Sequence, residues 1–334
     1  MLPLARLASA CGRRLGTPVY VERPCRGEGT GNTRYTRRSL RTAGTVRMTL
    51  RHQSIEVGLT AGEVQRIRVM AVGDVHLRAD APMSVQEGLR LAADEVDLVL
   101  LTGDMTDNGR KIEVEQVARV MAGVDAPVYA VMGNHDRRTL RRKEFRRALA
   151  TGGVELLDGE STVVESRHGL RVGLVGIGGY GGGFWPDEAP DLLSTRFSQA
   201  VAVRARREAA RLEAALDALA SHDTDLVIVT MHYAPTTTTL GAEPMMKHWM
   251  LGNSVLGRVV DRHDVALVLH GHAHLGNYHG VTPGGTPVRN VALPVVGAPV
   301  VLEVGRDGVV DRYEAGEQRA ARMMAASRDR SRIP

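Results

Sequence analysis

Eight polar residues of the kinds that bind metal ions occur in five short clusters along this sequence. The set combines five imidazoles, two carboxylates and one amide: Asp74, His76, Asp104, Asn134, His135, His232, His272 and His274. A closed structural zinc takes four protein ligands, so eight candidates exceed what one such ion needs. The number suits two adjacent ions roughly 3.5–4 Å apart, which can hold the oxygens of a phosphoryl group between them.

The donor atoms in these clusters are nitrogen and oxygen, which favours Mn, Fe, Zn, Ni or Co over soft metals. Both cysteines of the chain, Cys11 and Cys25, lie far upstream of the clusters, so thiolate ligands are absent from this part of the sequence. Each cluster alone has an ordinary explanation as a turn, a helix cap or a structural histidine. The series as a whole therefore carries the prediction of a metal centre.

The elements that must position these residues alternate between short β-rich runs and amphipathic helical stretches, which is typical of an α/β fold. Strands are predicted over 67–72, 97–101, 127–132, 226–231 and 266–269, and each ends just before one cluster. Helices are predicted over 85–95, 112–121, 138–150, 198–221 and 254–262, with antiparallel strands over 155–176. Ligand sites of α/β sheets collect at the carboxyl ends of strands, so the five clusters are expected to converge.

The ordered series of motifs resembles the calcineurin-like metallophosphoesterase family. In this chain the motifs read GDVH, GDMTD, GNHD, a single His at 232, and GHAH. The details DVHL, GDMTDNG and GNHDRR are similar to bacterial phosphodiesterases of the cyclic-nucleotide and glycerophosphodiester type. The resemblance implies a four-layer αββα sandwich of two mixed β-sheets flanked by helices.

The resemblance also implies a role for each residue of the motifs. The ligands that it implies for the first metal ion are Asp74, His76 and His274. The ligands that it implies for the second ion are Asn134, His232 and His272. Asp104 would bridge the two ions, and His135 would face the substrate with Asp136 orienting it from behind. Asp107 is left as either a support of the ligands or a turn residue.

The function expected from these roles is dinuclear-metal-dependent hydrolysis of phosphoester bonds in a small molecule. A metal-bridging hydroxide would attack phosphorus in line, and His135 would assist the leaving group. A phosphodiesterase is favoured, and a phosphomonoesterase or a nuclease on the same fold is the alternative. A non-catalytic metal-binding scaffold is a third interpretation, and the complete ligand set argues against it.

The charge of the chain is distributed unevenly. The first 47 residues hold ten arginines and two glutamates, a net +8, so residues 48–334 carry −3 of the total of +5. A mildly acidic body argues against binding of nucleic acid, which needs clustered basic side chains. We interpret residues 1–47 as a disordered or mis-started basic extension, with a targeting segment as the alternative.

The remaining boundaries are expected at a lead-in segment over 48–66, a metallophosphoesterase domain over 67–305 and a charged, mobile tail over 306–334. No apolar run has the roughly 18 residues that a membrane span needs, and a cytoplasmic protein is expected.

The Met/Trp-rich segment Glu243–Met250 suggests core or a homodimer contact more than a pocket wall. The glycine-rich segment Gly178–Pro190 is expected to be a loop, with covering of the substrate as the functional alternative. Of Arg137 and Arg138, one could contact phosphate, with a solvated helix face as the alternative.

Overall fold

The computed structural model describes residues 44–50, 53–59, 65–80, 96–139, 141–189 and 195–311. The chain divides into two compact units, Met1–Glu63 and Val64–Pro334. In the first unit, strand β1 (Gly44–Leu50) pairs antiparallel with β2 (Gln53–Leu59). This hairpin lies across residue 47, where we expected the extension to end. The extension up to residue 43, the helix expected over 85–95 and the tail beyond residue 311 lie outside the described residues.

The second unit contains two six-stranded mixed sheets. The first sheet has the order β14-β13-β3-β4-β5-β6. Its strands are β3 (Arg66–Val72), β4 (Leu98–Leu101), β5 (Val128–Ala130), β6 (Val154–Leu156), β13 (Val300–Gly305) and β14 (Gly308–Asp311). Strands β3 to β6 run parallel to one another, whereas β13 is antiparallel to β3 and β14. The carboxyl ends of β3, β4 and β5 therefore lie at one edge of this sheet.

The second sheet has the order β11-β12-β10-β9-β8-β7. Its strands are β7 (Glu160–Glu165), β8 (Arg171–Ile177), β9 (Leu226–Met231), β10 (Leu267–His270), β11 (His279–Val281) and β12 (Pro287–Asn290). Strands β8, β9, β10 and β12 are parallel, and β7 and β11 are antiparallel additions at the two edges. Of the antiparallel strands expected over 155–176, β7 and β8 form such a pair, whereas β6 joins the first sheet in parallel.

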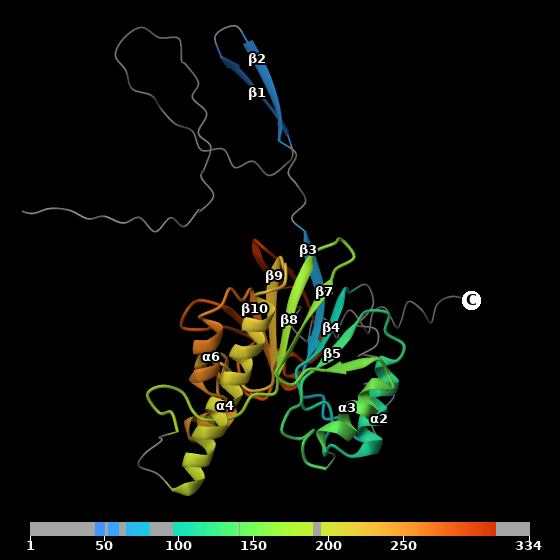
Figure 1. The fold of residues 1–334 in the computed structure, drawn as a ribbon, viewed down its shortest axis with the longest axis vertical. Helices are drawn as coiled ribbons and strands as arrows, with labels where there is room; N and C mark the ends of the chain where they lie inside the picture. Colours follow the sequence, from blue (N-terminus) through green and yellow to red (C-terminus); the bar gives the residue numbers. More distant parts are fainter. Residues whose placement is uncertain are drawn as a thin grey trace, which may run out of the picture. The chain divides into compact units, whose positions relative to one another are not determined.

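Helices cover the outer face of each sheet. The helices of the described part are α2 (Lys111–Met121), α3 (Arg142–Ala150), α4 (Arg196–Leu219), α5 (His248–Leu251), α6 (Ser254–Val260) and α7 (Leu293–Val296), with 3-10 turns η1 (Thr237–Thr239) and η2 (Met245–Lys247). Figure 1 shows α2 and α3 beside β4 and β5, with α4 and α6 on the opposite side of the sandwich. No helix in this part of the chain is long and apolar enough to cross a membrane.

The alternation of side chains along the strands explains the four layers. In β3, Ile67 and Val69 pack in a core between the two sheets, whereas Met70 and Val72 pack against α2 and α3. Successive side chains of a strand point to opposite faces, so a strand that is apolar on both faces requires cover on both. A third core packs α4 and α6 on the second sheet through residues such as Leu212. The predicted αββα sandwich of two mixed sheets is confirmed.

Candidate metal centre

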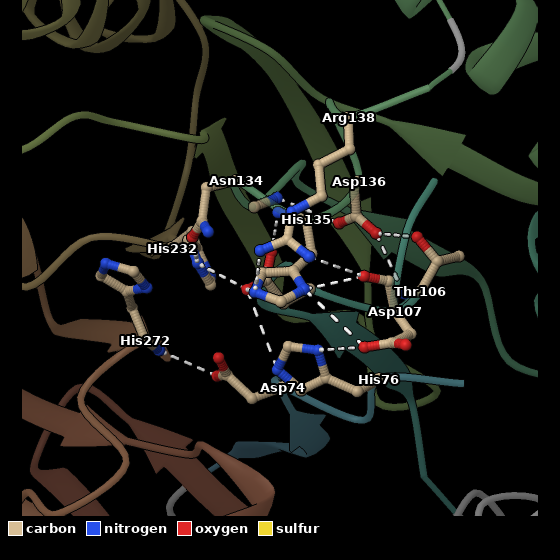
Figure 2. A network of polar contacts seen from close by, with 12 residues as sticks. Asp74, His76, Thr106, Asp107, Asn134, His135, Asp136, Arg138, His232 and His272 are labelled. Carbon is tan, nitrogen blue, oxygen red and sulfur yellow. Dashed lines mark hydrogen bonds and ion pairs between the residues drawn. The ribbon is translucent and has the colours of Figure 1, made fainter. Parts of the chain in front are cut away.

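The five clusters of polar residues follow the carboxyl ends of five parallel-running strands. Asp74 and His76 follow β3, Asp104 follows β4, and the pair Asn134 and His135 follows β5. On the second sheet, His232 comes directly after β9, and His272 and His274 come just after β10. Figure 2 shows side chains from both sheets around one space: Asp74, His76, Asn134, His135, His232 and His272.

The candidate ligand atoms form three adjacent groups, two of which share the carboxylate of Asp74. The atoms within each group lie no more than 4.8 Å from one another. The first group consists of Asp74, Asp104, His232 and His272, the second of Asp74, His76 and His274, and the third of His76, Asp107 and His135. The amide oxygen of Asn134 lies 3.1 Å from Nε2 of His232, next to the first group. The structure therefore brings together seven of the residues expected as ligands, and His135 lies beside them, 4.0 Å from Asp104.

Backbone amides hold the two carboxylates in place. Asp74 accepts a hydrogen bond at Oδ2 from the backbone N–H of His272 at 2.8 Å, and its Oδ1 lies 2.9 Å from Nε2 of His274. Asp104 accepts a hydrogen bond at Oδ1 from the backbone N–H of His135 at 2.8 Å. Both aspartates are almost completely buried, so these bonds replace the solvation that the charged groups lose.

Backbone carbonyls select which ring nitrogen of the histidines faces the centre. His232 Nδ1 lies 3.0 Å from the carbonyl oxygen of Thr102, and His272 Nε2 lies 3.2 Å from that of Met250. A carbonyl oxygen only accepts, so these nitrogens carry the hydrogen. When each ring is neutral, the opposite nitrogen has the lone pair that a metal requires.

Four of the ligand residues adopt a backbone conformation that side chains usually avoid. Within the described ranges, the non-glycine residues with positive φ are Asp74 at 55°, His76 at 47°, Asp104 at 47° and His272 at 70°. Each such residue typically costs on the order of 1–3 kcal/mol and is associated with functional sites. Every one of them belongs to the predicted metal centre.

Two further observations test whether a metal fits. Both ring nitrogens of His76 are buried and have no hydrogen-bond partner among the described residues, which leaves this imidazole available to a metal ion. A Cβ on Gly133 would lie 2.0 Å from Oδ1 of Asp104, and a Cβ on Gly271 would lie 2.1 Å from Oδ2 of Asp74. The glycines therefore allow the backbone to approach the carboxylates closely, and the donor set fits divalent cations.

The charges of the centre shift the protonation of its members. Burial lowers the pKa of His232, but the carboxylate of Asp104 outweighs burial and raises this pKa to about 9. Burial raises the pKa of Asp104, but the charge and hydrogen bond of His232 outweigh it and lower the pKa well below its usual range. Burial, together with the charge on His232, lowers the pKa of His272 to about 3. Without cations, a protonated His232 supplies the positive charge that balances the carboxylates.

Asp136 has different contacts from those expected. Its carboxylate accepts hydrogen bonds from the backbone N–H and hydroxyl of Thr106, at 3.0 and 2.7 Å, and from the N–H of Gly133 at 3.0 Å. The ring nitrogen Nδ1 of His135 instead lies 2.8 Å from the backbone carbonyl of Asp107. The expectation that Asp136 orients His135 from behind is therefore wrong, because Asp136 joins the loops that follow β4 and β5. Burial and the nearby Asp104 raise the pKa of Asp136 to about 6.

Sequence reasoning left one neighbour of the ligands open and missed another. Asp107 lies beside the centre, with a carboxylate oxygen within 4.8 Å of ligand atoms of His76 and His135. The ring of Tyr233, which the sequence did not single out, lies 4.5 Å from that of His272, between centroids. The position of this tyrosine directly after the ligand His232 was the available signal for the contact.

The Met/Trp-rich segment Glu243–Met250 lies largely on the surface rather than in the core. Met245 and Met246 are each 81% exposed, so the expectation of a core segment is wrong for them. The glycine-rich segment Gly178–Pro190 contains buried Phe184 and exposed Trp185, and substrate covering by this loop stays a prediction.

Comparisons with known proteins agree with this geometry. Two curated relatives match in part: the "Probable glycerophosphodiester phosphodiesterase GpdQ" of Arcobacter nitrofigilis, 41% identical over 49 residues, and the "Uncharacterized metallophosphoesterase YkoQ" of Bacillus subtilis, 30% identical over 125 residues. The matches cover 15% and 35% of this chain and 18% and 44% of the relatives, so the chain spans less than half the length of either.

A solved structure, TT1561 of Thermus thermophilus, is similar in fold with a TM-score of 0.51 and 15% identity. The similarity covers 75% of this chain and 99% of that one. The family description "Calcineurin-like phosphoesterase" matches residues 67–276, which is more than half of the chain and includes every residue of the centre. The chain therefore belongs to the calcineurin-like phosphoesterase family, whose members are metal-dependent phosphoester hydrolases.

Proposed function

We propose that this protein hydrolyses phosphodiester bonds with two divalent metal ions. The observation that carries the proposal is the presence of two adjacent ligand groups, one with Asp74, His76 and His274 and the other with Asp104, His232 and His272 beside Asp74. A single closed site uses about four ligands, whereas this centre offers donors for two. The similarity to the probable glycerophosphodiester phosphodiesterase of Arcobacter nitrofigilis supports a diester rather than a monoester as substrate.

The roles of the individual ligands form part of the proposal. Asp74, His76 and His274 would hold one ion, because their ligand atoms form a group of their own. Asn134, His232 and His272 would hold the second, and Asp104 would bridge, with its Oδ2 3.9 Å from Nε2 of His76 and 3.5 Å from Nε2 of His232. Bound divalent ions supply Lewis acidity, which lowers the pKa of water and neutralises charge on phosphoryl oxygens.

His135 is the candidate for transferring a proton to the leaving oxygen. Its Nδ1–H donates to the carbonyl of Asp107, and its Nε2 lies 4.0 Å from Oδ2 of Asp104, on the side of the ligand groups. In the imidazolium form, Nε2 would protonate the departing alkoxide, a contribution of roughly 10²–10⁴-fold to the rate for general acids. The fixed ring orientation supports this role.

Two measurements on the purified chain test the proposal. Elemental analysis after incubation with Mn²⁺ and desalting should give two ions per chain, and hydrolysis of bis-p-nitrophenyl phosphate should exceed that of p-nitrophenyl phosphate. Faster hydrolysis of the monoester would favour a phosphomonoesterase. Stoichiometric metal without hydrolysis of either ester would favour a non-catalytic scaffold. A small-molecule substrate, a cytoplasmic location and a homodimer remain predictions.

A further inference from the structure

Two adjacent arginines after the GNHD motif have different surroundings. Arg137 directs its guanidinium to Asp158, with Nη2 3.3 Å from Oδ1. Asp158 is buried and is also paired with Arg142 and Arg211. The charge of Arg137 is therefore compensated within the fold.

Arg138 instead reaches the metal centre. Its Nη2 lies 2.8 Å from Nε2 of His135, and its Nη1 lies 3.3 Å from the backbone carbonyl of Asp107 and 3.5 Å from Oδ1 of Asn108. Figure 2 shows its side chain extending over His135. All of these partners are uncharged acceptors, and no carboxylate of the described ranges forms an ion pair with Arg138. An exposed cation without a counterion thus lies next to the residue proposed to serve the leaving group.

The hydrogen bond to His135 pairs the guanidinium of Arg138 with a neutral acceptor. A phosphate oxygen adds the attraction of opposite charges, which a neutral imidazole lacks, and guanidinium matches phosphate oxygens in a bidentate way. An anionic phosphoester that enters the centre would compete with the imidazole for Arg138. When Arg138 moves to the phosphate, Nε2 of His135 becomes available to the substrate.

We propose that Arg138 is a substrate-binding residue whose guanidinium leaves His135 Nε2 to contact an anionic oxygen of the phosphoester. The inference rests on the proposed function, because it concerns the substrate of the same site. It also distinguishes the two arginines: Arg138 binds the substrate, whereas Arg137 holds the fold through Asp158. The substrate preference that follows is for esters with a negatively charged oxygen within reach of His135.

Inorganic phosphate is the probe for the first test, with binding to the Mn²⁺-loaded chain measured by calorimetry. Arg138→Ala should weaken phosphate binding roughly tenfold to hundredfold, the range for a charge-assisted hydrogen bond. Arg138→Lys should recover part of the affinity, because it keeps the charge but loses the bidentate geometry. The matched control is Arg147→Ala, which removes an exposed arginine of the nearby helix α3 and should change the affinity less than twofold.

The same variants separate this inference from the proposed function. With bis-p-nitrophenyl phosphate, Arg138→Ala should lose kcat/KM by a similar factor while its metal content stays at the wild-type value. Added guanidinium ion should restore part of the activity of Arg138→Ala and none of the activity of His135→Ala. Equal phosphate affinity in Arg138→Ala and wild type, or an equal loss in Arg147→Ala, would overturn the inference. If the wild type hydrolyses neither ester, the proposed function fails, and the phosphate measurement still decides the role of Arg138.

Discussion

The two sheets contribute chemically different halves of the metal centre. The first sheet supplies both carboxylates, Asp74 and Asp104, together with the amide of Asn134 and two imidazoles. The second sheet supplies imidazoles alone, from His232, His272 and His274. Asp74 connects the two halves, because it accepts a hydrogen bond from the backbone N–H of His272 and contacts His274. One sheet thus provides the negative charge of the centre, and the other provides the imidazoles that this charge holds.

This difference indicates that losses on the two sides have different consequences. Removal of a carboxylate takes away both a ligand and the charge that retains divalent cations. Loss of a residue that lies beside the ligands should affect turnover and leave the cations bound. The predictions below test this division, beginning with the largest expected effect.

Asp104→Ala should abolish stoichiometric metal binding and nearly all hydrolysis. The change removes a carboxylate that lies within 4 Å of imidazoles from both sheets. Elemental analysis of the desalted protein gives the metal content, and Asp125→Ala, at an exposed aspartate, is the matched control. Two retained ions per chain in Asp104→Ala would show that Asp104 is no bridging ligand.

His135→Ala should keep both metal ions and lose turnover roughly 10²–10⁴-fold, because only the proton transfer is removed. Metal content and kcat are measured on the same preparation. His272→Ala provides the contrast from the second sheet, since it should lower metal content as well as rate. Full turnover in His135→Ala would refute the leaving-group role.

Asp158→Ala should destabilise the protein by on the order of 3 kcal/mol without changing its metal content, because it leaves three arginines without their common buried partner. Burial raises the pKa of Asp158, but Arg137, Arg211 and Arg142 outweigh burial and lower it. The carboxylate therefore stabilises the fold above its unfolded pKa of 3.8, and the contribution disappears as the pH falls through the folded pKa.

Chemical denaturation of wild type and Asp158→Ala at pH 7 and at pH 3 measures this contribution. The difference in the free energy of unfolding should be large at pH 7 and should shrink at the lower pH. A difference that is the same at both pH values would contradict the ionic origin of the stabilisation.

Metal binding should release a proton from His232. Below pH 9, the apparent affinity for the metal ion should therefore rise by up to about tenfold for each unit by which the pH increases. The cause is the carboxylate of Asp104 on the first sheet, which raises the pKa of His232 on the second sheet to about 9. In the metal-free protein, this raised pKa contributes stability that is complete below about 6.5 and disappears as the pH rises through about 9.

Calorimetry of Mn²⁺ binding in buffers with different ionisation enthalpies counts the released protons. Near pH 7.5 the count should approach one per chain. Metal binding without proton release would mean that His232 is already neutral, and that the carboxylate of Asp104 does not keep its imidazole protonated.

The sequence was sufficient to find the residues that the structure gathers at the candidate centre, and insufficient for the groups that support them. Asp74, His76 and the His272–His274 pair could be found because residue type and a strand ending coincide at each. The carbonyls of Thr102, Met250 and Asp107 could not, since every residue carries the same backbone group. Asp136 misled for a related reason: adjacency to His135 says nothing about which way a buried carboxylate points.

The fold shows the same division. The strands that are apolar on both faces were predictable. One face of such a strand packs in the core between the two sheets, and the other face packs in a core under the helices. The sheet to which a short strand belongs was harder to predict. Strand β6 continues the first sheet, although β7 follows only four residues later in the second.

Four of the candidate ligands have a left-handed backbone conformation, and this conformation sets stability against metal binding. At those positions glycine would relieve strain, but it would also remove the ligand, so stability and metal binding are opposed there. At His272, with φ of 70°, substitution by glycine should yield a more stable metal-free protein than substitution by alanine, the reverse of the usual order. A chain selected only for thermal resistance would therefore tend to drift away from catalysis at these positions first.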